Sequence, residues 1–337
     1  MTTEPLLEVR DLQVELKAGH GVVHAVRGAS FAVAPGEALG LVGESGSGKT
    51  MALRAIVGLL PRVGSITGGS IALDGEELTG MSPKRVRDLR GRAISMVFQE
   101  PMTALNPVMR VGDQIAETPR RRLGRSKAQA YDRALELMRL VGIPDPVRRA
   151  RAYPHELSGG LRQRVMIAIA LAGDPRVILC DEPTTALDVT IQDQILKLLS
   201  GLREELGVAL VFVSHDLAVI AQTCQKVAVM YGGMVVETGA VADVFREPRH
   251  PYTLSLLRSV PDYEQIRDRL STIPGAPPDL VHPPAGCPFH PRCPFAQEDC
   301  KSGDFPLRAL SADRATACIH PDACEADVAR EPVIANA

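Results

Sequence analysis

The chain contains the octapeptide Gly43-Glu44-Ser45-Gly46-Ser47-Gly48-Lys49-Thr50 between two apolar runs, EALGLV (37–42) and MALRAIVGLL (51–60). A strand, a glycine-rich loop ending in Lys-Thr, and a helix together predict a phosphate-binding loop. Its backbone N–H groups curl around the phosphates, and the helix N-terminus adds positive potential. We therefore expect Lys49 to contact the β- and γ-phosphates of a nucleotide and Thr50 to bind Mg²⁺.

Two adjacent carboxylates, Asp181 and Glu182, end the apolar run RVILCDE (176–182). They would be costly at the end of a buried strand unless they met a metal or a reactant. Successive side chains of a strand point to opposite faces, so the two carboxylates have separate tasks. We expect Asp181 to bind Mg²⁺ through water and Glu182 to polarise the water that attacks the γ-phosphate.

A second anion-binding helix start is predicted at Leu157-Ser158-Gly159-Gly160-Leu161, before the apolar run RVMIAIALA (164–172). Backbone N–H groups of Ser158, Gly159 and Gly160 would bind phosphate there, although an ordinary helix N-cap at Ser158 is the alternative. Two such helix ends serve one nucleotide only when two chains face each other head to tail, because one cradles the phosphates and the other caps them.

Residues 43–50, 157–161 and 176–182 resemble the Walker A loop, the signature sequence and the Walker B strand of the ABC ATPases, in that order. The resemblance to this family covers roughly residues 6–245. The resemblance implies ATP and Mg²⁺ as ligands and adds three site residues. Gln99 in FQEP matches the Q-loop residue that senses Mg²⁺ and the membrane partner. Asp188 lies in the D-loop (186–188), and His215 in VSHD matches the switch histidine at the γ-phosphate.

Two positions depart from the family pattern. Leu161 stands where the family has Gln, but the backbone donors before it are unaffected, so we expect a competent site. The aromatic residue that stacks on adenine in the family falls at His20, counted back from ASF (29–31). An imidazole stacks less strongly than Tyr or Trp, and an ordinary loop histidine is the alternative for His20.

The fold class is predicted as α/β, a P-loop ABC ATPase domain with a mixed sheet, an antiparallel β subdomain and a helical subdomain. Non-alternating apolar runs typical of buried parallel strands occur at 37–43, 92–98, 176–182 and 208–215. Antiparallel strands are expected within 6–16, 25–33 and 70–75, and a hairpin over 226–239 with its turn at Gly232 and Gly233.

The predicted domains are a nucleotide-binding domain over residues 1–247 and a C-terminal extension over 248–337. The helical subdomain covers about 102–173, where apolar residues recur with helical spacing. After Glu247, Pro becomes frequent and hydrophobic periodicity fades. We expect the phosphate-binding segments to fold on a core separate from this extension.

Composition argues against a nucleic-acid partner, because the net charge is -2, Trp is absent and aromatic residues make up only 4%. No apolar run approaches the roughly 18–20 residues of a membrane span, and the N-terminus lacks a secretory pattern. We expect a cytoplasmic protein that meets the membrane by docking on other subunits.

Segments 98–115, 250–261 and 273–280 resemble the peptide/nickel importer branch of the family. The resemblance implies an ATPase that energises uptake of dipeptides and oligopeptides, with nickel as the alternative solute. It implies a second ABC ATPase subunit in a heterodimer, two membrane permeases, an extracytoplasmic binding protein, and a peripheral location on the cytoplasmic face of the membrane. A soluble ABC ATPase of DNA repair or translation is the competing class.

Five of the seven cysteines crowd into residues 287–324, whereas Cys180 and Cys224 lie in the apolar body. Four of the five are separated by five, six and seventeen residues: Cys287, Cys293, Cys300 and Cys318. A reducing cytoplasm favours metal binding over disulfides, and the spacing alone leaves zinc and an iron–sulfur cluster open. The resemblance implies a [4Fe–4S] cluster on these four. We interpret Cys324 as a spare thiol and His290 and His320 as loop residues, with replacement of one ligand by any of these three as the alternative.

Overall fold

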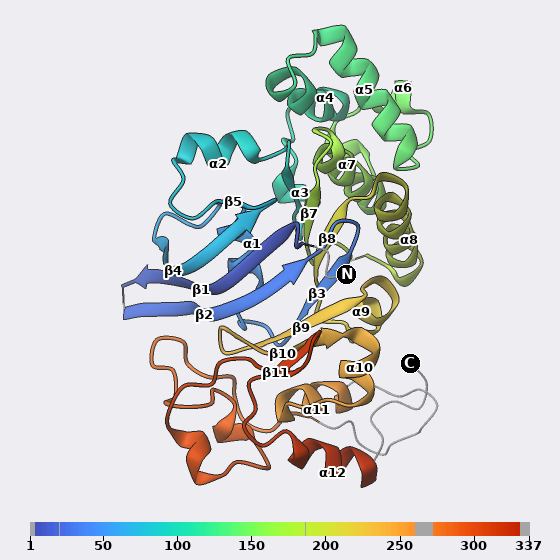
Figure 1. The fold of residues 1–337 in the computed structure, drawn as a ribbon. Helices are drawn as coiled ribbons and strands as arrows, with labels where there is room; N and C mark the ends of the chain where they lie inside the picture. Colours follow the sequence, from blue (N-terminus) through green and yellow to red (C-terminus); the bar gives the residue numbers. More distant parts are fainter. Residues whose placement is uncertain (1–3, 20, 186, 260–271, 331–337) are drawn as a thin grey trace. The chain divides into compact units, whose positions relative to one another are not determined.

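The computed structural model describes residues 4–19, 21–185, 187–259 and 272–330 (Figure 1). These residues form two compact units, and each is described by itself. The first unit comprises residues 4–6, 33–37 and 80–213, and the second comprises 7–32, 38–79 and 214–330. Within the described ranges, no helix combines the length and the apolar character that a membrane crossing requires.

The first unit contains three parallel strands, with β7 (Val177–Asp181) paired to both β6 (Ile94–Val97) and β8 (Ala209–Val213). Every residue of β7 and β8 is buried, so the prediction of parallel strands covered on both faces is confirmed. The carboxyl end of β7 is Asp181, the predicted Mg²⁺ ligand, and the predicted water-polarising residue Glu182 follows it directly.

Helices make up most of the remainder of the first unit: α2 (Pro83–Leu89), α3 (Pro101–Ala104), α4 (Val111–Arg122), α5 (Lys127–Leu140), α6 (Pro146–Arg149), α7 (Gly159–Leu171) and α8 (Val189–Leu206), with the 3₁₀ turn η1 (Pro154–Glu156). Helices α4, α5 and α7 pack on one another. A capping box begins α5, because Ser126 Oγ accepts from Gln129 N and the Gln129 side chain accepts from Ser126 N. Helices α4, α5, α6 and α7 lie inside the range of about 102–173 that the sequence predicts to be helical.

The second unit contains an antiparallel sheet in the order β2-β1-β4-β5, and these strands lie side by side in Figure 1. Their bounds are β1 (Leu7–Ala18), β2 (Gly21–Val33), β4 (Gly64–Leu73) and β5 (Glu76–Glu77). Strand β3 (Ala38–Val42) runs parallel to β9 (Lys226–Tyr231), and β9 forms a hairpin with β10 (Met234–Ala240). The hairpin turns at Gly232 and Gly233, as predicted. Helices α1 (Lys49–Ile56), α9 (Leu217–Thr223), α10 (Val241–Arg246) and α11 (Pro251–Arg258) complete this part.

The extension adds strands that the sequence pattern did not predict. Strand β12 (Arg314–Thr316) pairs with β10 and with β11 (Arg308–Ser311), and the chain continues to α12 (Asp322–Arg330). The 3₁₀ turns η2 (His290–Arg292) and η3 (Glu298–Lys301) precede these strands. Strand β11 is exposed along its length, so hydrophobic alternation could not reveal it.

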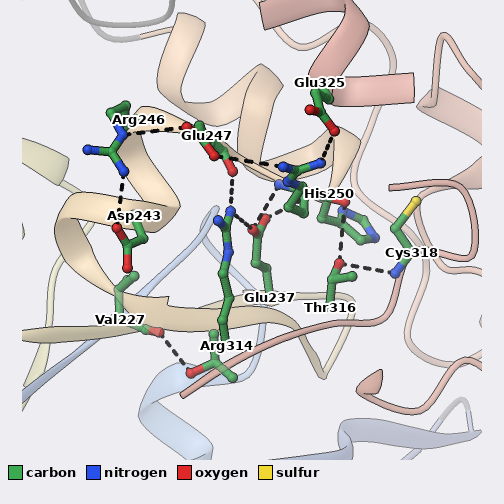
Figure 2. A network of polar contacts seen from close by, with 12 residues as sticks. Val227, Glu237, Asp243, Arg246, Glu247, His250, Arg314, Thr316, Cys318 and Glu325 are labelled. Atoms are coloured by element: carbon green, nitrogen blue, oxygen red, sulfur yellow. Dashed lines mark hydrogen bonds and ion pairs between the residues drawn. The ribbon is translucent and has the colours of Figure 1, made fainter. Parts of the chain in front are cut away.

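A buried carboxylate fixes the extension to the hairpin (Figure 2). Glu237 of β10 is 0% exposed and accepts bonds from Arg249 N at 2.8 Å, His250 N at 2.9 Å and an Arg314 guanidinium nitrogen at 3.1 Å. Burial raises the pKa of Glu237, and these donors oppose that rise. A buried ion pair is tolerated best when hydrogen bonds fill its remaining polar positions. Both oxygens of the Glu237 carboxylate accept such bonds, whereas Arg314 Nε is buried and has no hydrogen-bond partner among the described residues.

Candidate nucleotide-binding site

The predicted phosphate loop joins β3 to α1 in the second unit. Gly48 precedes the helix with φ 101°, and a Cβ there would lie 2.4 Å from Ala25 O. At Gly43, with φ 147°, a Cβ would lie 2.1 Å from Met230 O. Both positions combine a backbone conformation that favours glycine with no room for a side chain, so the spacing of the glycines is a steric requirement.

The Lys49 ammonium lies against the loop that precedes it, and the residue is only 6% exposed. Its Nζ donates to Gly43 O at 2.7 Å, Glu44 O at 2.9 Å and Ser47 Oγ at 3.2 Å. The positive charge is therefore held beside the N–H groups of the loop, where a polyphosphate would meet both.

The predicted water-polarising residue, Glu182, directly follows β7 in the first unit. Its φ is 46°, an uncommon value for a non-glycine residue and one that often marks a functional position. Oε2 accepts from Gln99 Nε2 at 3.2 Å and from Thr185 Oγ1 at 2.9 Å. The structure thus brings Gln99 and Glu182 together. Thr185 was not predicted, and its only sequence signal is a hydroxyl three residues after the carboxylate.

The signature residues begin α7, with Ser158 at its N-cap position. The Ser158 side chain makes no capping hydrogen bond and is exposed, as is Gly159. Ser158 therefore has the position of the alternative, an ordinary N-cap, but not the side-chain hydrogen bond that usually accompanies it. Asp188 does cap a helix, because its Oδ1 accepts from Ile191 N at 2.9 Å at the start of α8.

His215 is exposed and lies in the second unit with the phosphate loop. The neighbouring Ser214 N–H donates to Leu41 O at 3.3 Å, which places His215 beside the end of β3. The first unit holds the remaining predicted residues: Gln99, Ser158, Gly159, Gly160, Asp181, Glu182 and Asp188. His20 lies outside the described residues.

The four cysteines predicted as metal ligands line one pocket together with Phe289, Phe295, Phe305 and Ile319. Backbone contact also joins their loops, because Cys287 N donates to Cys300 O at 2.9 Å. Burial raises the pKa of the Cys293 thiol to about 11 and that of Cys318 to about 12, with neighbouring cysteines adding to the rise. Four thiols around one apolar pocket are a suitable donor set for a soft metal centre.

Other candidate ligands lie near these four thiols. His290 and His320 line the same pocket, although His290 Nδ1 is 2.9 Å from Cys287 O and His320 Nε2 is 3.0 Å from Asp299 Oδ1. Ligand atoms of Asp299, Cys300 and His320 lie within 4.8 Å of one another. Cys324 is 0% exposed and belongs to α12, outside the pocket lining.

The expectation that the phosphate loop folds apart from the extension is wrong. Glu44 of the loop donates its N–H to Tyr252 Oη at 2.7 Å, and its carboxylate forms a 2.7 Å ion pair with Arg292. Tyr252 and Arg292 both follow Glu247, so the extension reaches the loop itself. Contacts between residues this far apart in the sequence leave no local pattern to detect.

Solved structures and a family model define the class of the protein. Residues 26–185 match the family model described as ABC transporter. The fold is similar to a dimeric ATP-binding cassette in a post-hydrolysis state bound to ADP and Pi, with TM-score 0.62 and 29% identity over 70% of this chain and 98% of that one. It is also similar to cbiO1 from Clostridium perfringens, part of an ABC transporter complex, with TM-score 0.61 and 27% identity over 72% and 90% of the two chains. The molecule is an ABC ATPase cassette.

Curated relatives and a second model define the branch. The chain is 47% identical over 316 residues to the oligopeptide transport ATP-binding protein OppD of Salmonella typhimurium, covering 94% of each chain. It is 49% identical over 322 residues to OppD of Mycobacterium bovis, but spans only about half of that relative, 52% of its length. Residues 236–300 match the oligopeptide/dipeptide transporter C-terminal region. The chain belongs to the ABC transporter family, in its oligopeptide/dipeptide transport branch.

Proposed function

We propose that this chain is the ATP-hydrolysing subunit of an importer of dipeptides and oligopeptides. Residues 43–50 would hold the phosphates, while Thr50, Gln99 and Asp181 would hold Mg²⁺. Mg²⁺ would neutralise charge on the β- and γ-phosphates. Glu182 would take a proton from the attacking water, and His215 would donate a hydrogen bond to the γ-phosphate.

The main support for this proposal is that one chain contains both an ATPase cassette and a C-terminal region of the transporter type. A cassette with a phosphate loop is continuous with a C-terminal region that matches the oligopeptide/dipeptide transporter model. Nickel is not favoured as the solute, because the curated relatives quoted above are named for oligopeptide transport. A role in DNA repair or translation gains no support from those relatives or from the net charge of -2.

The proposed assembly follows from the division of the site between two helix starts. Ser158, Gly159 and Gly160 would cap a nucleotide held by the phosphate loop of a second ABC subunit, in a heterodimer. Two permeases and an extracytoplasmic binding protein would complete the importer, with this chain peripheral on the cytoplasmic face. We also propose that His20 contacts the adenine and that Asp188 is the D-loop residue at the ATP interface.

The proposed domains are a cassette over residues 1–247, with a helical subdomain over about 102–173, and an extension over 248–337.

Transport by the complete importer tests the proposed solute. The chain, its partner cassette, the permeases and the binding protein are reconstituted in vesicles with ATP on the cassette side. We expect ATP-dependent uptake of radiolabelled dipeptides and oligopeptides and no uptake of ⁶³Ni²⁺, because the C-terminal region is of the peptide type. Vesicles without ATP are the control. Nickel uptake without peptide uptake would reverse the assignment.

The extension is proposed to hold a [4Fe–4S] cluster through Cys287, Cys293, Cys300 and Cys318. A cubane cluster takes four thiolates, and these four thiols line one apolar pocket. The cluster would cross-link loops that have little regular structure of their own. Because no redox partner is indicated by the sequence, we propose a structural role for it.

Anaerobic purification tests the cluster. We expect a brown protein with about four irons and four acid-labile sulfides per chain. Serine at Cys293 or Cys318 should lower the iron content and increase proteolysis of residues 287–318, because one cluster bond is lost. Cys324→Ser is the matched control, since this thiol is buried nearby on α12 and should leave the iron unchanged. A colourless protein that contains one zinc and no sulfide would show that this is a zinc site, and the [4Fe–4S] assignment would be wrong.

A further inference from the structure

Arg292 belongs to the extension, and its guanidinium lies against Glu44 of the phosphate loop. The Arg292 side chain is only 5% exposed. Two of its nitrogens donate to the Glu44 carboxylate, at 2.7 and 3.1 Å. The other donors reach Tyr231 Oη at 3.1 Å, Pro274 O at 2.7 Å and Ile273 O at 3.2 Å. A guanidinium has five N–H groups in a planar fork, and each of them has a partner here. The guanidinium is therefore held in one position and orientation against Glu44.

Glu44 is held at every polar group it has. Its N–H donates to Tyr252 Oη at 2.7 Å, and its carbonyl accepts from Lys49 Nζ at 2.9 Å. Its carboxylate is occupied by the fork of Arg292. Glu44 is the second residue of the phosphate loop, so the path of the loop is fixed from outside by two residues of the extension.

The turn that carries Arg292 is itself rigidly placed. Arg292 N donates to Phe289 O at 2.9 Å, and the Phe289 ring packs edge-on against Tyr231 with centroids 5.2 Å apart. Cys287 and Cys293, two of the proposed cluster ligands, flank this turn on either side. The guanidinium also lies 5.8 Å from the centroid of the Tyr231 ring. Arg292 is thus presented to the loop by packed aromatic rings and a fixed backbone.

We infer that Arg292 is a positioning residue for the phosphate loop, and that the extension sets the affinity for MgATP by clamping Glu44. This inference rests on the proposed nucleotide function. The loop binds phosphate only when its N–H groups point at the phosphate oxygens. The apparent affinity for MgATP is therefore proportional to the fraction of molecules whose loop has this conformation. Arg292 acts through Glu44 and makes no contact with the nucleotide.

Equilibrium binding of Mg²⁺ with the non-hydrolysable ATP analogue AMP-PNP tests the clamp in the full chain. Calorimetry should show about tenfold weaker binding for Arg292→Ala, a typical size for coupling between a remote residue and a site. Arg292→Lys should lie between Ala and wild type, because an ammonium keeps the charge but loses the planar fork. Arg308→Ala, on the exposed strand β11, is the control and should bind as wild type.

A double-mutant cycle separates positioning from general stability. Glu44→Ala combined with Arg292→Ala should bind no more weakly than the weaker single variant, because both remove one clamp. Wild-type affinity in Arg292→Ala or Arg292→Lys, even with a lower unfolding temperature, would overturn the inference, as would additive losses. If Arg292→Ala does not fold, the Lys variant decides by the same criterion. Absence of AMP-PNP binding by the wild-type chain is a different result, which refutes the proposed function and the clamp with it.

Discussion

Glu182→Gln is expected to lower ATP turnover by about 10²–10⁴-fold while leaving MgATP affinity near that of wild type. The amide keeps the size of the carboxylate and can still bond to Thr185, but it cannot accept a proton from water. Steady-state phosphate release measures turnover, and equilibrium binding measures affinity, both with an intact partner cassette present. ATP should then hold the two cassettes together, because the step that separates them is blocked.

The matched control for this prediction is Glu205→Gln, an exposed carboxylate near the end of α8. Its turnover should equal that of wild type, since it makes the same chemical change away from the site. Near-normal hydrolysis by Glu182→Gln would show that another group takes the proton. Loss of binding in Glu182→Gln would instead indicate that this carboxylate supports the nucleotide pocket in the ground state.

The parts of the fold that the sequence predicts well are those with local causes. Strands β7 and β8 are continuous apolar runs because both their faces are covered, and the hairpin turn is marked by Gly232 and Gly233. The phosphate loop can also be recognised locally, from the residue spacing of one octapeptide, although the atoms that exclude a side chain at Gly43 and Gly48 belong to Met230 and Ala25. Each of these features can be recognised from residues that are neighbours in the sequence.

The parts that sequence patterns miss depend on partners far along the chain. Glu237 is a buried acid in an apolar strand, and its donor Arg314 lies 77 positions away. Arg292 meets Glu44 across 248 positions, so neither residue carries a signal of the other. Strand β11 pairs with β12 but is exposed along its length. It therefore lacks the alternation of apolar and polar residues on which strand prediction depends. Thr185 was missed for a simpler reason, because a hydroxyl beside a strand end is common in loops.

Lys49 is the cation of the phosphate loop, and its ammonium lies against the loop backbone. Its ammonium is buried and bonded to three oxygen atoms of the loop, so the positive charge is already desolvated. Phosphate oxygens carry more negative charge than these carbonyl and hydroxyl oxygens, and exchange of partners therefore favours the nucleotide. The exchange happens in the ground state, before any bond to phosphorus breaks.

Lys49→Ala is accordingly expected to act on binding first, and to weaken MgATP affinity by at least about 30-fold, as truncation of a buried charged partner commonly does. Calorimetry with Mg²⁺ and AMP-PNP measures the loss directly, without interference from turnover. Lys197→Ala on α8, where the lysine is 71% exposed and pairs with Asp193, is the control and should bind normally. Thermal unfolding without nucleotide establishes that the variant is folded, since the lysine also bonds to its own loop. Wild-type affinity in a folded Lys49→Ala protein would mean that the backbone N–H groups alone determine phosphate binding, and the role assigned to this lysine would be wrong.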